Sequence, residues 1–260
     1  MSEIRVSIIV PAFREGENIK LLTEGIFKAL SAKNLDKVTE LIIVDDNSKD
    51  KTVEVVQQLK SKYPVRVIVR TTERGLSSAV LRGFSEAKGR YLLCMDADLQ
   101  HPPQSVPDLI ESLEKGNEFV IGTRYGGGSL SVDKDWPMHR IIISKGARAL
   151  ARPLTPLSDP MTGFFGITRP AYQRAIQNGI NPIGFKIALE MYVKARIKKH
   201  GEVSIVFGVR HAGESKLTGA VIINYLKHLV ELYSFALPLL LPILLAVALV
   251  LLYVLYKILV

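Results

Sequence analysis

Two aspartates separated by one residue, Asp96 and Asp98, stand directly after an apolar run over residues 91–95. The run predicts a buried strand of an α/β sheet, and residues two apart on an extended backbone point to the same side. Both carboxylates should therefore emerge at the carboxyl end of the strand, where open α/β sheets bind ligands. The pair suits a hard divalent cation, Mg²⁺ or Mn²⁺, to which Gln100 could add a neutral oxygen ligand. The alternative for so short a motif is a solvated turn.

A second acidic pair, Asp45 and Asp46, follows another apolar run over residues 41–44. Because the carboxyl ends of parallel strands meet at one edge of a sheet, both acidic groups should face the same crevice, as in a nucleotide site. The alternative role is N-capping of the next helix. The sequence contains no Gly-rich dinucleotide fingerprint and no Gly-Lys-Ser/Thr loop, so metal and basic side chains must hold any phosphates.

Basic residues recur at helical spacing further along the chain. Arg140, Ser144, Arg148 and Arg152 fall at four-residue steps and would form one stripe on a helix. Arg offers a bidentate fork to a phosphate and Ser a further donor, so the stripe predicts phosphate binding, above all at Arg140. The alternative is a solvated charged face or contact with anionic lipid headgroups.

A polar loop over residues 211–217 follows an apparent strand end at residues 207–210. Arg210 before the loop and Lys216 within it are candidate clamps on a pyrophosphate. The small residues of the loop would let it close over a bound nucleotide. The alternative is an ordinary surface loop.

Strands and helices must position these side chains. Apolar runs predict strands at residues 6–10, 41–44, 65–69, 91–95 and 118–122, and helical periodicity predicts helices at residues 19–30, 52–60 and 75–87. Strands that alternate with helices indicate βαβ units and a mainly parallel sheet. The sequence therefore predicts an α/β fold with its acidic residues at one edge of the sheet.

The composition of the 260-residue chain sets limits on its partners. Hydrophobic residues make up 48%, ample for a core, and the formal net charge of +9 favours an anionic partner such as phospholipid headgroups or phosphorylated substrates. Nucleic acid is not favoured, because the sequence has no zinc-ligand spacing and no RNA-binding aromatic motif. The single cysteine, Cys94, excludes an intrachain disulfide and is expected to be a small buried residue.

The C-terminal segment has the composition of a membrane anchor. No charged residue occurs from Leu232 to Tyr256, a stretch that at about 1.5 Å per residue can cross a bilayer core of about 30 Å. Tyrosines at both ends suit the membrane interface, and Lys257 could reach the far headgroups. We therefore expect a transmembrane helix at residues 234–257. A buried core helix or a hydrophobic oligomer contact is the alternative.

Several segments share their pattern with one known family. They are residues 10–15, 44–48, 74–76, 95–102, 122–125, 158–165 and 213–217. In combination they resemble family 2 glycosyltransferases, and among them the enzymes that mannosylate dolichyl phosphate. The resemblance implies the glycosyltransferase A-type fold, a Rossmann-like nucleotide-binding sheet, here with a C-terminal transmembrane helix. The expected divisions are a catalytic domain at 1–210, an active-site loop with an amphipathic juxtamembrane segment at 211–233, and a tail anchor at 234–257.

The resemblance also implies roles for individual residues. The guanosine site would be lined by Pro11, Phe13, Glu15, Val44 and Asp46, while Asp96 and Ala97 would contact nucleotide and sugar. Asp98 and Gln100 would hold the divalent metal on the diphosphate. Phosphates of donor or acceptor would be bound by Arg124, Arg210 and Lys216, and Arg140 and Ser144 would add contacts to the substrate. Catalysis would then rest on Asp96, Asp98, Arg210 and Lys216.

The activity implied is transfer of mannose from GDP-mannose to dolichyl phosphate, with inversion at the anomeric carbon. Such an acceptor is already anionic and needs no strong general base. The tail anchor implies a cytoplasmic catalytic domain at the endoplasmic reticulum membrane, working without an obligatory protein subunit. The alternatives are a UDP-glucose:dolichyl-phosphate glucosyltransferase and a non-catalytic, tail-anchored protein that binds lipid phosphate.

Overall fold

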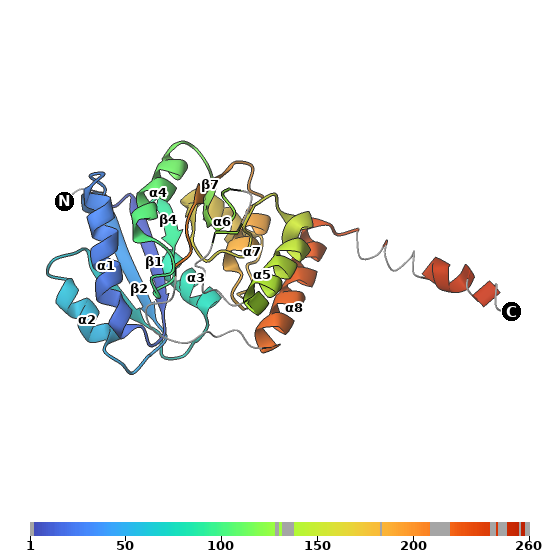
Figure 1. Ribbon diagram of the computed structural model, residues 1–260, viewed down its shortest axis with the longest axis horizontal. Helices are drawn as coiled ribbons and strands as arrows, with labels where there is room; N and C mark the ends of the chain where they lie inside the picture. The colour runs from blue at the N-terminus through green and yellow to red at the C-terminus, as the bar shows by residue number, and fades with distance from the viewer. Residues whose placement is uncertain are drawn as a thin grey trace.

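The computed structural model describes residues 3–127, 130–131, 138–182, 184–208, 219–239, 243, 249–254 and 256–257. Seven strands among them form one sheet in the order β3-β2-β1-β4-β6-β5-β7 (Figure 1). The strands are β1 (Val6–Ala12), β2 (Thr39–Asp45), β3 (Val65–Val69), β4 (Tyr91–Cys94), β5 (Phe119–Thr123), β6 (Phe165–Thr168) and β7 (His200–Ser204). The helices are α1 (Gly16–Ser31), α2 (Thr52–Leu59), α3 (Leu76–Glu86), α4 (Val106–Glu114), α5 (Met138–Ala151), α6 (Arg169–Gln177), α7 (Ile187–Lys194) and α8 (Gly219–Ala236).

The first four strands pair with one another in parallel, as the alternation of strands and helices predicted. β6 runs antiparallel to both β4 and β5, and β7 is parallel to β5, so the sheet is mixed. The parallel half of the sheet, β3-β2-β1-β4, therefore presents its carboxyl ends at one edge. This edge carries the acidic residues that the sequence analysis singled out.

Helices cover both faces of the sheet. On one face α1, α2 and α4 pack against β1 side chains such as Ile8 and Val10. On the other face α3, α6 and α7 pack against Ile9 of β1 and against β2 and β4. Every residue of β2 is buried, which explains why its sequence is a nearly continuous apolar run rather than an alternating one.

A third apolar cluster joins α5 and α8 to the outer side of α7. The two outer helices are also linked by hydrogen bonds, because the hydroxyl of Tyr225 donates to the carbonyl of Ala147 at 2.7 Å and that of Tyr233 donates to the carbonyl of Leu150 at 2.7 Å. α5 and α8 therefore lie side by side at the end of the body opposite α1 and α2 (Figure 1).

Some boundaries differ from the sequence-based expectations. β7 ends at Ser204, so Phe207 and Gly208, the described part of the strand end expected at residues 207–210, lie beyond it; residues 209 and 210 lie outside the described residues. α5 ends at Ala151 and Arg152 begins a short 3₁₀ turn, so the predicted helical stripe of basic residues breaks at its last member. Arg152 is therefore not aligned with Arg140, Ser144 and Arg148, because a 3₁₀ turn has fewer residues per turn than an α-helix.

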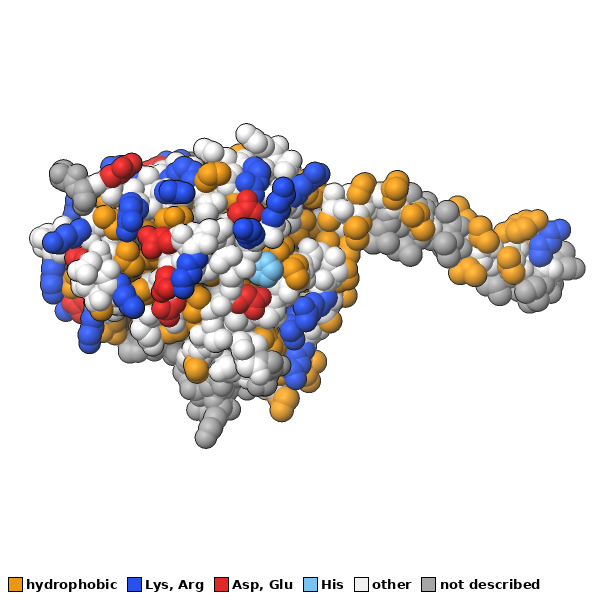
Figure 2. All heavy atoms as spheres, turned by 90° about the horizontal axis from the view of Figure 1, so that it is seen from above, with side chains coloured by type: hydrophobic (Ala, Val, Ile, Leu, Met, Phe, Trp, Pro, Cys, Tyr) orange, Lys and Arg blue, Asp and Glu red, His pale blue; other side chains and the backbone are white. Residues whose placement is uncertain are grey.

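The C-terminal segment extends away from the α/β body, and Figure 2 shows mainly hydrophobic side chains on its coloured residues, whereas charges of both signs cover the body. No helix within the described residues is long and apolar enough to cross a membrane. The span predicted at residues 234–257 includes 240–242, 244–248 and 255, which lie outside the described residues. The transmembrane helix therefore stays a prediction.

Candidate active site

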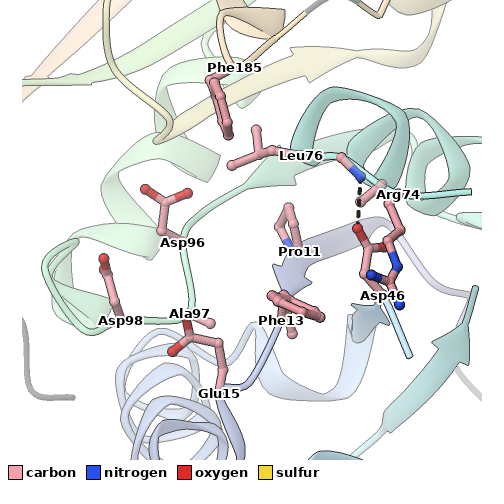
Figure 3. Close-up of a pocket in the computed structure, with 13 residues that line it drawn as sticks. Pro11, Phe13, Glu15, Asp46, Arg74, Leu76, Asp96, Ala97, Asp98 and Phe185 are labelled. Atoms are coloured by element: carbon pink, nitrogen blue, oxygen red, sulfur yellow. Dashed lines mark hydrogen bonds between the residues drawn. The ribbon is translucent and has the colours of Figure 1, made fainter. Parts of the chain in front are cut away.

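A cavity of about 390 Å³ opens at the carboxyl ends of β1, β2 and β4 (Figure 3). It is lined by Pro11, Ala12, Phe13, Glu15, Asp46, Arg74, Gly75, Leu76, Ala79, Asp96, Ala97, Asp98 and Phe185. Asp46 and the Asp96/Asp98 pair come from different strand ends and line the same cavity, as the parallel arrangement predicted. This edge of the sheet is where open α/β folds bind ligands.

A tight turn after β4 holds the two carboxylates of the Asp96/Asp98 pair. The backbone N–H of Asp96 donates to Nδ1 of His101 at 3.1 Å, and the backbone N–H of Gln100 donates to Oδ1 of Asp98 at 3.1 Å. Leu99 between them has a φ of 63°, a conformation that non-glycine residues rarely adopt. The turn therefore fixes the backbone of Asp96 and the carboxylate of Asp98 at the cavity edge, and the Asp96 side chain is 33% exposed.

The acidic edge has the chemistry to hold a hard divalent cation. Asp96 and Asp98 present their carboxylates on the same side of the cavity in Figure 3. Mg²⁺ typically binds through one or two carboxylates together with substrate phosphates and water. No group of three or more His, Cys, Asp and Glu side chains in the described part of the chain could hold a metal by itself. A cation held by Asp96 and Asp98 would leave coordination positions for a phosphorylated ligand.

The structure places Gln100, predicted to ligate metal, in the buried part of the acidic turn. Its side chain is almost fully buried, it is not among the residues that line the cavity, and its Nε2 donates to the carbonyl of Gly208 at 2.9 Å. The backbone N–H of Gly208 donates back to the carbonyl of Gln100 at 3.0 Å. Gln100 thus ties the acidic turn to the chain that follows β7.

His101 supports the same turn from inside the protein. Its ring stacks on Phe164 at 5.2 Å between centroids and meets the edge of Phe207 at 5.4 Å. Burial lowers the pKa of His101 to about 4, although the charge of Asp98 acts in the opposite direction. His101 is therefore neutral near pH 7, with its Nδ1 accepting the hydrogen bond from Asp96.

The residues after β1 form the adjoining wall of the cavity. The ring of Phe13 lies beneath the guanidinium groups of Arg14, at 5.2 Å, and Arg74, at 5.8 Å. Glu15 accepts a hydrogen bond from Nδ2 of Asn18 at 2.6 Å, which fixes its carboxylate at the start of α1, where negative charge is favourable.

The two residues of the second acidic pair, Asp45 and Asp46, have different roles. Asp46 lines the cavity and accepts hydrogen bonds from Nε of Arg70 at 2.7 Å and from the backbone N–H of Gly75 at 2.8 Å. Asp45 instead stabilises its turn by accepting the backbone N–H of Ser48 at 3.0 Å. Val44, expected at the guanosine site, is fully buried in the core beneath α3 and is not among the lining residues.

The structure pairs Arg124 with a carboxylate. Its Nε and Nη2 donate to the two oxygens of Asp159 at 2.7 and 2.9 Å, and Asp159 is fully buried. Burial raises the pKa of Asp159, but the hydrogen bonds and charge of Arg124 outweigh this and hold it below its ordinary value. The guanidinium expected to bind a substrate phosphate is thus engaged in a bidentate ion pair, and Arg124 is not among the residues lining the cavity.

The remaining predicted residues lie away from the described cavity or outside the described structure. Ser144 is partly exposed on α5, and the guanidinium of Arg148 lies 4.1 Å from the ring centre of Tyr125. Arg140 begins α5, but its side chain lies outside the described structure. Arg210 and Lys216 also lie outside the described residues.

Several residues that line the cavity have no role that the sequence alone predicts. Arg74, Gly75 and Leu76 stood in a family motif, whereas Phe185 gave no signal because an isolated apolar residue usually indicates packing. Lys186 beside it donates from Nζ to the carbonyl of Met161 at 2.9 Å. Burial and the charge of Arg124 lower the pKa of Lys186 to about 8, while the carboxylates of Asp159 and Asp96 act against this shift. Lys186 is therefore a buried lysine with a lowered pKa, close enough to the acidic turn for the charge of Asp96 to act on it.

Known proteins are similar to this chain in sequence and in fold. Dolichol-phosphate mannosyltransferase of Mycosarcoma maydis is 56% identical over 234 residues, covering 88% of this chain and 79% of the relative. The protein of the same name from Saccharomyces cerevisiae is 56% identical over 238 residues, covering 89% of this chain and 88% of the relative. A mannosyltransferase from Pyrobaculum calidifontis, solved with GDP-Man and Mn²⁺, has a TM-score of 0.62 at 19% identity, covering 92% of this chain and 65% of that one, and so shares the fold.

The family match covers most of the α/β body. Residues 7–175 match the family described as Glycosyl transferase family 2, a stretch that runs from β1 to α6 and includes every cavity residue except Phe185. The predicted A-type α/β fold and the predicted family are therefore confirmed. The chain belongs to glycosyl transferase family 2.

Proposed function

We propose that this enzyme transfers mannose from GDP-mannose to dolichyl phosphate, with inversion at the anomeric carbon. The observation that carries the proposal is that one cavity has walls that join Asp46 and Phe13 to the Asp96/Asp98 pair. One wall suits a nucleoside and the other suits a metal-bound diphosphate, as a nucleotide-sugar donor requires. The identity to curated dolichol-phosphate mannosyltransferases, 56% over most of the chain, supports mannose and dolichyl phosphate as the substrates.

Asp96 and Asp98 are the residues that would hold a divalent cation, Mg²⁺ or Mn²⁺. When bound, the cation supplies positive charge to the diphosphate of the donor. The turn that ends in His101 keeps the backbone of Asp96 and the carboxylate of Asp98 in place before the donor arrives, so little reorganisation is needed. The Mn²⁺ in the related mannosyltransferase supports this assignment.

The protein's own work is mainly positioning, because the phosphate acceptor is already a nucleophilic anion. Phe13, Glu15 and Asp46 orient the nucleotide, and Asp96 and Ala97 face the sugar. We propose that Arg210 and Lys216 bind the departing diphosphate, and that Arg140 and Ser144 receive the acceptor phosphate. Arg124 contributes by holding the loop of Asp159 beside the acidic turn.

The surface formed by α5 and α8 is suited to contact with a membrane. Both helices expose large apolar side chains, among them Ile142 at 64%, Ile223 at 56% and Val230 at 55%. Such a face next to the C-terminal segment would rest on lipid and keep the site near an acceptor embedded there. We propose a tail anchor at residues 234–257, a cytoplasmic catalytic domain at the endoplasmic reticulum, and no obligatory protein subunit.

The test is transfer of label from GDP-mannose or UDP-glucose to lipid, with full-length protein in detergent, dolichyl phosphate and Mn²⁺. Lipid-extractable label from GDP-mannose alone, lost with EDTA, is the expected result. Label from UDP-glucose alone would move the protein to the glucosyltransferase activity. No label from either donor, with a folded protein, would favour a binding protein without catalysis.

A further inference from the structure

Arg70, which directly follows β3, lies behind the nucleotide wall of the cavity. Its side chain is only 4% exposed and is not among the lining residues. All three guanidinium nitrogens nevertheless donate hydrogen bonds: Nε to Oδ1 of Asp46 at 2.7 Å, Nη1 to Oγ of Ser78 at 2.8 Å and Nη2 to the carbonyl of Gly75 at 2.8 Å. One buried side chain thus joins the end of β2 to the start of α3.

The partners of Arg70 are parts of the cavity wall. Asp46 and Gly75 line the cavity and are also bonded to each other, through the backbone N–H of Gly75 and Oδ2 of Asp46 at 2.8 Å (Figure 3). Gly75 has a φ of 122°, which only glycine adopts without strain. The residues on either side of it, Arg74 and Leu76, line the cavity as well, so the bonds to Gly75 set the position of the whole stretch.

The backbone of Arg70 is anchored to the same place. Its N–H donates to the carbonyl of Asp45 at 2.8 Å, which keeps the guanidinium in register with the carboxylate of Asp46. A planar guanidinium can donate in three fixed directions, whereas a lysine ammonium is a single point charge on a flexible stem. The three bonds therefore require arginine rather than positive charge alone.

We propose that Arg70 is a positioning residue for the nucleotide part of the donor. It holds Asp46 and the Arg74–Leu76 stretch in the arrangement that receives the nucleoside, and it leaves the acidic turn of Asp96 and Asp98 untouched. Loss of the three guanidinium hydrogen bonds lowers the affinity for the nucleotide but leaves the rate of transfer from the bound donor unchanged. This inference rests on the proposed use of a nucleotide-sugar donor.

The experiment compares Arg70→Lys with Arg66→Lys in the full-length protein in detergent micelles. Arg66 is the matched control because it lies on β3, the strand that Arg70 follows, and pairs with Glu40 and Glu86, away from the cavity. Calorimetric titration with GDP and Mn²⁺ measures binding without an acceptor. We expect Arg70→Lys to raise the Kd for GDP about tenfold or more, which corresponds to a loss of about 1.4 kcal/mol or more of binding free energy. Arg66→Lys should leave the Kd for GDP within about twofold of the parent value.

Steady-state transfer separates positioning from general damage. Arg70→Lys should raise the KM for GDP-mannose about as much as the Kd for GDP, with kcat within about twofold of the parent. A variant that is merely less folded would lower kcat through its smaller active fraction and keep KM unchanged. If Arg70→Lys does not fold, Ser78→Ala removes one of the three bonds and should raise the Kd for GDP about two- to threefold.

Unchanged GDP affinity in a folded Arg70→Lys protein would overturn the inference, and so would a fall in kcat at constant KM. Failure of the proposed function looks different, since the parent protein itself would then not bind GDP. Equal weakening by Arg66→Lys would also count against Arg70, because it would assign the effect to the strand rather than to the fork.

Discussion

At the residue scale, the proposed metal site depends most on Asp98. Its carboxylate lines the cavity and accepts the backbone N–H of Gln100 at 3.1 Å, a bond that an amide oxygen can also accept. Asp98→Asn should therefore keep the turn but lose the charge. We expect transfer to fall at least about 100-fold and Mn²⁺ affinity at least about 10-fold, since even indirect supports of a metal usually cost that much. Electron paramagnetic resonance titration of Mn²⁺ and the transfer assay measure the two effects.

The control for Asp98 is Asp108→Asn, the same substitution at an exposed position in the first turn of α4. It should change neither Mn²⁺ affinity nor transfer. Full activity of Asp98→Asn with its parent's metal dependence would remove Asp98 from the site.

The ion pair of Asp159 and Arg124 predicts a pH-dependent contribution to stability. Asn is nearly isosteric with protonated Asp, so Asp159→Asn should lower the free energy of unfolding by about 3–5 kcal/mol at neutral pH, as for other broken buried pairs. Because Arg124 holds the folded-state pKa of Asp159 below 3.8, its contribution is complete above that pH and is lost as the pH falls through the folded-state value.

Urea unfolding of the parent protein and of Asp159→Asn at several pH values tests this pH dependence. The difference between parent and Asp159→Asn should stay constant from about pH 7 to about pH 5 and shrink only below about pH 4. A difference that is absent at neutral pH, or that disappears between about pH 7 and about pH 5, would show that the pair does not act in this way.

The residues that the sequence could place are those whose geometry is local. Asp96 and Asp98 are two apart at a strand end, and Asp46 follows a parallel strand, so spacing alone put them at one edge. Arg124 could not be placed, because its partner Asp159 is 35 residues away and lies in a loop with no periodic pattern. Arg70 gave no signal for the same reason: its three partners meet only when β2, β3 and α3 are assembled.

At the element scale, the packing of α3 on the sheet depends on a missing side chain. A Cβ on Gly83 would lie 2.5 Å from Cγ2 of Ile9 and 3.1 Å from Cγ2 of Val44. Gly83→Ala should therefore destabilise the protein by about 1–3 kcal/mol through overpacking, although alanine favours a helix by about 1 kcal/mol. Gly146→Ala on α5 is the matched control, because within the described part of the chain no atom beyond its neighbours and its own helix backbone lies within 4 Å of the added Cβ.

Thermal unfolding distinguishes the two glycines. Gly146→Ala should raise the melting temperature slightly and Gly83→Ala should lower it by several degrees. Equal stabilisation by both substitutions would mean that α3 can shift on the sheet, and the close packing beneath the cavity wall would then not be rigid.

Elements with strong periodicity were predictable, and those defined by pairing were not. β1 and β2 are buried on both faces and therefore appear as apolar runs. β7 carries His200, Glu202 and Ser204 at a half-exposed sheet edge, so its sequence has no run to detect. β6 has only four residues, and its place between β4 and β5 comes from antiparallel pairing with strands distant in the sequence.

At the scale of the whole molecule, the exposed apolar face of α5 and α8 lies at the opposite end from α1 (Figure 1). A buried ion-pair network holds α8 against α7 behind this face. Nζ of Lys194 of α7 lies 2.9 Å from Glu190 and 2.7 Å from Glu231 of α8. A face held this rigidly would rest on a bilayer in one orientation, and the cavity would stand at a fixed height above the lipid phosphates.

Single-cysteine labels can test that orientation, because the native Cys94 is only 1% exposed and should not react. We expect a fluorophore on Ile142→Cys or Ile223→Cys to be quenched by spin-labelled lipid when the full-length protein is reconstituted in vesicles. A label on Leu21→Cys of α1, at a side chain of comparable exposure, should not be quenched. The comparison isolates the helix face, since all three proteins carry the same C-terminal segment. Similar quenching at all three positions, or none at the first two, would mean that the α5–α8 face does not rest on the bilayer and that only the C-terminal segment could bring the cavity to its lipid acceptor.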